Sequence, residues 1–205
     1  MSQRISKTVI AFLAVVIGLY PGIYFILQDR TFGLLSTKSP ELLADTFWNI
    51  GFYTHIIFGG IALLIGWLQF HQKLLRKKAA LHRLIGKVYV VSVLLSALAG
   101  IGTGFTATGG LIASVGFICL GIIWFTTTLL AYLKIRASQI EQHRKLMIYS
   151  YAACFAAVTL RVWLPLLMIV SGDYLVAYLI VSWLCWVPNM EVANLIVKKL
   201  KPYNS

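Results

Sequence analysis

Six apolar stretches, each long enough to cross a bilayer, dominate this chain of 205 residues. An α-helix needs roughly 20 apolar residues to cross about 30 Å of hydrocarbon. The composition agrees, because apolar residues make up 60% of the chain, charged residues make up 12%, and the mean hydropathy is +0.84. We therefore predict an all-α integral membrane protein with six transmembrane helices, near Lys7–Leu27, Trp48–Phe70, Leu84–Phe105, Leu111–Leu133, Leu146–Val170 and Tyr174–Val197.

The first stretch follows two basic residues, as the core of a secretion signal does. It is interrupted by Pro21-Gly22, and Gln28-Asp29-Arg30 follows it without a small-residue cleavage pattern. We expect a retained helix that bends near Pro21. The longest outer loop covers only about Asp29–Phe47, which leaves no room for a second soluble domain. Residues 1–205 are therefore predicted to form a single six-helix transmembrane domain.

The net charge of +12 comes from basic residues that gather on one side of the predicted spans. Arg30 and Lys38 fall on the other side. Cytoplasmic loops carry the excess of Lys and Arg, so we expect an inner-membrane protein with both termini in the cytoplasm. The charge then indicates orientation, with anionic lipid headgroups as the expected partners and no nucleic acid. Fifteen of the 18 basic residues form this group: Arg4, Lys7, Lys73, Arg76, Lys77, Lys78, Arg83, Lys87, Lys134, Arg136, Arg144, Lys145, Lys198, Lys199 and Lys201.

No motif in the sequence identifies a reaction. The three cysteines, Cys119, Cys154 and Cys185, each fall inside a predicted span and form no Cys-x-x-Cys pair. We find no glycine-rich phosphate loop, zinc signature or Ser-His-Asp arrangement. Glycines such as Gly59-Gly60 lie within the spans, where small residues let helices approach closely. Whether the protein is an enzyme stays open at this stage.

Two His-Arg dipeptides organise the middle of the chain. His82-Arg83 and His143-Arg144 each end a short basic loop and open an apolar run, and a tyrosine lies two turns into each run, Tyr89 and Tyr149. This weak repeat suggests two parallel helical hairpins. We therefore expect spans two to five to form a central four-helix bundle, flanked by spans one and six.

The two histidines begin spans that run in the same direction, so their imidazoles can face each other near the cytoplasmic surface. Two neutral imidazoles suit a six-coordinate b-type haem, and Arg83, Arg144 and Lys145 could pair with its propionates. With Glu191 of span six, His82 and His143 could instead hold a divalent metal ion. A third interpretation is purely structural, because imidazoles and basic side chains are stable at a membrane interface without a ligand.

A second polar pair lies deeper in the predicted spans. His55 lies about seven residues into span two, and Arg161 lies about nine residues before the outer end of span five. A guanidinium at that depth costs roughly 2.5–3.5 kcal/mol on insertion scales, so it should face the interior and have a partner. The candidates are His55, the hydroxyls of nearby threonines, helix carbonyls and an anionic ligand. The pair therefore predicts either a polar cavity or a structural arginine.

Several short motifs lie along spans two to six: Gln69-Phe70, His82-Arg83-Leu84-Ile85-Gly86-Lys87-Val88-Tyr89-Val90, His143-Arg144-Lys145-Leu146-Met147-Ile148-Tyr149-Ser150-Tyr151, Val158-Thr159-Leu160-Arg161 and Trp186-Val187-Pro188-Asn189. Together these motifs resemble an uncharacterised family of bacterial membrane proteins, domain of unknown function 2306. The resemblance implies the fold and the polar positions without supplying a reaction.

The order of the histidines is also distantly similar to the cytochrome b561-type core, in which four central helices bear two bis-histidine haems. In that pattern the third and fifth spans hold one haem, which implies His82 and His143 in this chain. The second and fourth spans hold the other. His55 lies on span two, but span four has no histidine, and the expected position is occupied by Gly116. The likeness therefore implies one inner haem at most.

Two hypotheses from different classes follow. The first is a redox protein whose haem exchanges electrons with a quinone, a cytoplasmic donor or a partner subunit. The second is a transporter, or a protein that binds lipid or small anions, with His55 and Arg161 lining a cavity. A structural or assembly role is a third possibility. The sequence alone does not decide between them.

Overall fold

The computed structural model describes residues 2–27 and 33–200, and in these segments it contains helices and turns but no strand. Six helical segments are long and apolar enough to cross a membrane, at Thr8–Leu27, Thr46–Phe70, Ala79–Gly104, Gly110–Arg136, Ile140–Ser171 and Tyr174–Lys198. The predicted all-α, six-span class is confirmed. The described helices divide into two compact units, Met1–Ala99 and Gly100–Ser205.

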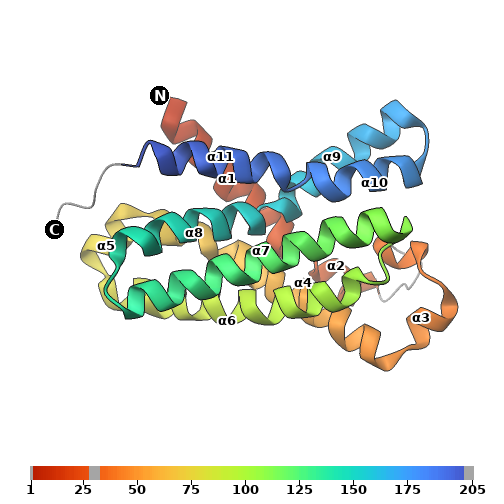
Figure 1. Cartoon of the computed structure of the whole chain (residues 1–205), viewed down its shortest axis with the longest axis horizontal. Helices are drawn as coiled ribbons and strands as arrows, with labels where there is room; N and C mark the ends of the chain where they lie inside the picture. The colour runs from red at the N-terminus through yellow and green to blue at the C-terminus, as the bar shows by residue number, and fades with distance from the viewer. Residues whose placement is uncertain (1, 28–32, 201–205) are drawn as a thin grey trace. The chain divides into compact units, whose positions relative to one another are not determined.

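The first unit contains the first three spans (Figure 1). Its helices are α1 (Ser2–Leu19), α2 (Gly22–Leu27), η1 (Gly33–Thr37), α3 (Pro40–Ala44), α4 (Thr46–Gly66), η2 (Trp67–Phe70), α5 (Gln72–Lys77) and α6 (Ala79–Gly104), whose last turn passes into the second unit. The interruption between α1 and α2 falls at Tyr20–Pro21, because proline has no N–H to continue the helical ladder. The predicted bend near Pro21 is confirmed.

Close backbone approach joins α1 to α4. A Cβ placed on Gly60 would lie 2.7 Å from the carbonyl oxygen of Gly18, and one on Gly18 would lie 2.6 Å from the Leu64 side chain. Neither position has room for a methyl group. The predicted use of small residues for helix approach is therefore confirmed at Gly60.

An aromatic cluster holds α2 against the start of α4. Trp48 and Phe52 stack with ring centroids 5.2 Å apart, and the Tyr24 ring meets Phe52 edge-on at 5.6 Å. Leu35 of η1 completes the buried cluster. Asp45 caps α4 by accepting a hydrogen bond from the Trp48 N–H at 2.7 Å, which fixes where the second span begins.

The second unit contains α7 (Gly110–Arg136), α8 (Ile140–Cys154), α9 (Ala156–Ser171), α10 (Tyr174–Leu184) and α11 (Val187–Lys198). Helices α7 and α8 form the hairpin labelled in Figure 1. In its interior, the fully buried hydroxyls of Thr128 and Ser150 are hydrogen-bonded at 2.6 Å. The hairpin turn uses Ser138 at a φ of 57°, in the left-handed region.

Spans five and six are both interrupted within this unit, a feature that was not predicted from the sequence. Span five bends at Phe155, between α8 and α9, and span six breaks at Cys185–Trp186, between α10 and α11. Pro188 explains the second break, because its ring excludes the carbonyl four residues earlier and it lacks an N–H. Pro165, in contrast, lies inside α9 without ending it.

Candidate functional site

The two His-Arg dipeptides occupy matching positions in their helices. α6 begins at Ala79 and α8 at Ile140, so His82 and His143 are each the fourth residue of a membrane-spanning helix. The helices begin before the predicted spans, which we placed from Leu84 and Leu146. Both imidazoles are half-buried. The structure therefore places each histidine near the start of its helix, shortly after the basic segment that precedes that helix in the chain.

The orientation of the His143 imidazole is fixed by the preceding helix. Its Nδ1 lies 2.9 Å from the carbonyl oxygen of Ala131 in α7. A carbonyl oxygen only accepts hydrogen bonds, so Nδ1 carries the proton and Nε2 carries the lone pair. A histidine that binds a metal through one nitrogen typically donates its other N–H to a carboxylate, a backbone carbonyl or water. The contact with Ala131 has this form.

Gln69 of η2 lies against the first turns of α6. Its Nε2 donates to the backbone oxygen of His82 at 3.4 Å, and a Cβ on Gly86 would lie 3.2 Å from its Oε1. Glycine at position 86 therefore leaves space for the Gln69 amide. These contacts explain why the Gln69-Phe70 and His82…Gly86 motifs occur together in this chain.

The cations that we assigned to the propionates differ in their surroundings. Lys145 forms an ion pair with Glu141, one helical turn earlier, at 2.7 Å. Arg83 is exposed and Arg144 is half-buried. The ion pair gives Lys145 a partner on its own helix.

The similarity between the two hairpins does not continue two turns into the second arms. Tyr89 is fully buried, whereas Tyr149 is half-buried and donates from its hydroxyl to Asn194 Oδ1 at 3.3 Å. Seven residues after His143, in the register of Tyr89 after His82, lies the buried Ser150. The repeat therefore extends to the starts of the helices but not to their cores.

His55 is tied to α6 by a reciprocal pair of hydrogen bonds. Its Nδ1 donates to the Ser96 carbonyl oxygen at 2.9 Å, and the Ser96 hydroxyl donates to the His55 carbonyl oxygen at 2.8 Å. Ser96 is fully buried. These contacts join spans two and three at the middle of the first unit and give His55 a structural role.

Arg161 has a helix carbonyl among its partners, one of the possibilities that the sequence left open. Its guanidinium donates to the Ala157 oxygen, one turn earlier in α9, at 2.9 Å. His55 belongs to the first unit and Arg161 to the second, so the hydrogen bonds to Ser96 and to Ala157 each lie within one unit. The predicted polar cavity between His55 and Arg161 stays a prediction.

The position where the b561-type pattern would place a fourth histidine is closely packed. A Cβ on Gly116 of α7 would lie 2.9 Å from the Ser182 carbonyl oxygen of α10 and 3.1 Å from the Trp183 Nε1. A side chain as large as histidine does not fit against this backbone. The missing ligand therefore reflects close packing of α10 against α7, within the second unit.

Glu191, the third ligand of the metal alternative, is exposed on α11. Across the segments that the structure describes, no three side chains of His, Cys, Asp or Glu are grouped so that they could hold a metal ion. We therefore do not propose the metal site.

A polar cluster that was not predicted from the sequence joins the two interrupted spans. Asn189, in the first turn of α11, donates from Nδ2 to the Cys185 oxygen at 3.0 Å, the Thr159 hydroxyl at 3.1 Å and the Ala152 oxygen at 3.3 Å. The Thr159 hydroxyl donates in turn to the Cys185 oxygen. The carbonyls released by the two breaks thus find donors, as backbone groups in a membrane must. The Trp186-Val187-Pro188-Asn189 motif was the available signal.

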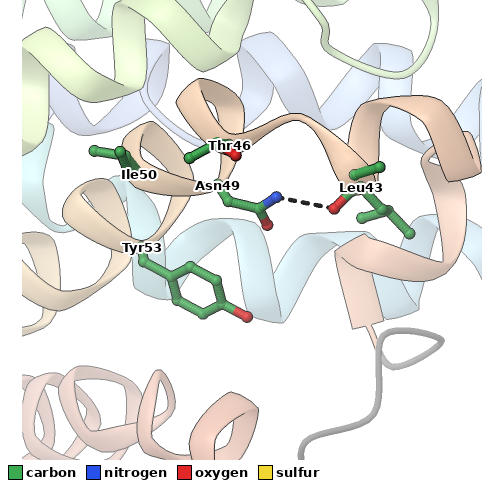
Figure 2. Close-up of a pocket in the computed structure, with 6 residues that line it drawn as sticks. Leu43, Thr46, Asn49, Ile50 and Tyr53 are labelled. Atoms are coloured by element: carbon green, nitrogen blue, oxygen red, sulfur yellow. Dashed lines mark hydrogen bonds between the residues drawn. The ribbon is translucent and has the colours of Figure 1, made fainter.

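A pocket of about 440 Å³ lies at the start of span two, and Figure 2 shows the residues that line it. Asn49 points across it, and its Nδ2 donates to the Leu43 oxygen at 2.9 Å and the Asp45 oxygen at 2.7 Å. These two hydrogen bonds therefore hold the end of α3 against the first turn of α4. The lining residues are Leu43, Ala44, Thr46, Asn49, Ile50 and Tyr53, and none of them is a predicted site residue.

A family model described as "Predicted membrane protein (DUF2306)" matches residues 52–197. The chain belongs to this family. The match begins in α4 and ends in α11, so it covers the histidines, Arg161 and the Asn189 cluster. The resemblance seen in the sequence is confirmed. No curated protein and no solved structure matches the chain, so the likeness to cytochrome b561 gains no support from these comparisons.

Proposed function

We propose that this protein is a membrane electron-transfer protein that binds one b-type haem between His82 and His143. The observation that carries the proposal is the hydrogen bond from His143 Nδ1 to the Ala131 carbonyl, which presents Nε2 as a ligand. His82 holds the corresponding fourth position of its own helix, α6. The order of the spans along the chain predicts that α6 and α8 run in the same direction across the membrane. Imidazole nitrogen is a usual axial ligand of haem iron.

Arg83 and Arg144 would hold the haem propionates in this proposal. Each directly follows a ligand histidine, and a guanidinium binds a carboxylate through two parallel hydrogen bonds. Lys145 instead stays with Glu141. When bound, the haem would supply a one-electron carrier. The residues of the chain would hold it, orient it and keep its propionates at the basic end of the spans.

The basic loops suggest how the protein sits in the cell. The excess of Lys and Arg at one end of the spans supports an inner-membrane location with both termini in the cytoplasm. The haem would then lie near the cytoplasmic face and exchange electrons with a quinone in the membrane or with a partner subunit. The alternative cavity at His55 and Arg161 has weaker support, since each has a hydrogen-bond partner within its own unit.

Haem content in histidine variants tests the proposal. The protein is expressed in haem-replete cells and purified, and haem is then measured per protein chain. We expect His82→Ala and His143→Ala to lose the haem, while His71→Ala, at an exposed position between η2 and α5, retains it. Equal haem content in all three variants, or none in the wild type after added haemin, would refute the proposed site.

A further inference from the structure

A groove opens at the basic end of the first unit, where span two turns into span three. It has a volume of about 420 Å³, and its walls include Trp67, Leu74, Leu81 and Ile85. His71 and the exposed Lys77 and Lys78 also line it, and we call the two lysines its cationic rim. The groove therefore combines an apolar lining with two positive charges.

The rim has no acidic counterpart nearby in the chain. No Asp or Glu occurs between Asp45 and Glu141, and neither Lys77 nor Lys78 forms an ion pair with any residue that the structure describes. Positive charge at the rim is therefore not neutralised locally. An anionic group from outside the chain is the chemically matched partner.

The position of the groove along the spans selects a lipid as that partner. One apolar span ends at Phe70 and the next begins at Ala79, so the groove lies at the depth where headgroups meet hydrocarbon. From the groove, exposed Leu81, Leu84 and Val88 continue along one face of α6 into the span. This stripe has the direction and chemistry to contact an acyl chain.

The Trp67 side chain contributes to the wall of the groove. Tryptophan at a membrane interface commonly lies at the level of the lipid headgroups, which agrees with the depth of the groove.

We propose that this groove is a specific site for an anionic phospholipid. The headgroup phosphate pairs with Lys77 and Lys78, and one acyl chain follows Leu81 and the apolar face of α6. The site is independent of the haem proposal, because it uses different residues and needs no cofactor.

Lipid retention by the full-length protein provides the test. The protein is placed in nanodiscs that contain a minor share of phosphatidylglycerol in phosphatidylcholine, and the lipids that stay bound after release are counted by native mass spectrometry. We expect the wild type to enrich phosphatidylglycerol. The double variant Lys77→Gln/Lys78→Gln should bind it about tenfold more weakly or worse, because each basic residue adds to attraction at an anionic surface.

Two further variants separate a built site from general attraction. Lys198→Gln/Lys199→Gln removes an exposed basic pair at the end of α11 and should leave the enrichment unchanged. Leu81→Trp keeps every charge but narrows the groove where the acyl chain would lie, and should abolish the enrichment. The Leu81→Trp result also decides the matter if the Lys77/Lys78 variant fails to fold, as judged by circular dichroism.

The proposal would be overturned by equal loss in the two double-lysine variants, by enrichment that survives Leu81→Trp, or by wild-type protein that shows no preference for phosphatidylglycerol. Competition with soluble glycerol phosphate tests whether the groove binds a free phosphate group. It should not displace the lipid at equal concentration, and displacement there would mean that the site binds a phosphate group and not a lipid.

Discussion

Replacing Asn189 tests whether the polar cluster holds the two interrupted spans together. Its amide carries two N–H groups, which serve two carbonyl oxygens and the Thr159 hydroxyl. Hydrogen bonds between transmembrane helices average about 0.6 kcal/mol and reach about 1.7 kcal/mol. Losing both donors in Asn189→Ala should therefore lower the free energy of unfolding by about 1–3 kcal/mol.

Asn194→Ala is the matched control, because Asn194 lies on the same helix but is exposed and makes one long hydrogen bond with Tyr149. Both changes give α11 the same alanine, so helix propensity cancels between them. We expect the control to change stability by less than about 0.5 kcal/mol. Unfolding in mixed micelles, followed by circular dichroism, gives both values.

A double variant checks the mechanism. Asn189 and Thr159 share a hydrogen bond, so Asn189→Ala/Thr159→Val should destabilise by less than the sum of the single changes. If Asn189→Ala unfolds like Asn194→Ala, Asn189 does not stabilise the breaks and the proposed role of the cluster is refuted.

Three other outcomes are expected. Gly60→Ala should lower the free energy of unfolding by about 1–3 kcal/mol, because its Cβ would lie 2.7 Å from the Gly18 carbonyl oxygen. Gly22→Ala, whose Cβ would have nothing within 4 Å, should not lower it, and thermal unfolding of the two variants gives the comparison. Hydrogen bonds from its own backbone and from Ser39 hold the pKa of Glu41 below 4.5, so stability should fall as the pH drops below that value. In Glu41→Gln this part of the loss of stability in acid should be absent. If the variant and the wild type lose stability with pH in the same way, Glu41 does not contribute as proposed. A reporter at the C-terminal end should read cytoplasmic, and a periplasmic signal would reverse the proposed orientation.

The spans were predictable because length and apolarity decide them in a membrane. Every predicted span overlaps a helix, and the bend at Pro21 followed from the missing proline N–H. The starts of α6 and α8 were placed too late. The first turn of α8 is polar and basic after Ile140, so it lacks the apolar signal although the helix continues through it. The first turn of α6 contains Ala79, Ala80 and Leu81, but the basic His82-Arg83 that follows interrupts the apolar run.

The breaks in spans five and six were not predictable in the same way. Phe155 carries no helix-breaking signal, and the Ala152 carbonyl beside this bend accepts a hydrogen bond from Asn189 of another helix. That contact joins residues far apart in the chain. Pro188 was a usable local signal, but the apolar run on either side of it hid the break.

The candidate site was predicted as a set of residues but not as a set of contacts. The sequence left open whether His55 and Arg161 line a polar cavity or Arg161 is structural, and it did not specify that His55 bonds to Ser96 or that Arg161 donates to Ala157. Lys145 was assigned to a propionate, but Glu141 lies one turn away on the same helix. The sequence predicts how deep in the membrane each of these groups lies, whereas the packing of the helices determines which neighbour each group contacts.

The central claim is that His82 and His143 hold a haem, and one optical spectrum of the purified wild-type protein tests it most directly. Two neutral imidazole ligands give low-spin iron, so reduction should produce the sharp visible bands of a b-type haem. A colourless protein that takes up no added haemin would contradict the claim, as would a high-spin spectrum that persists in His143→Ala.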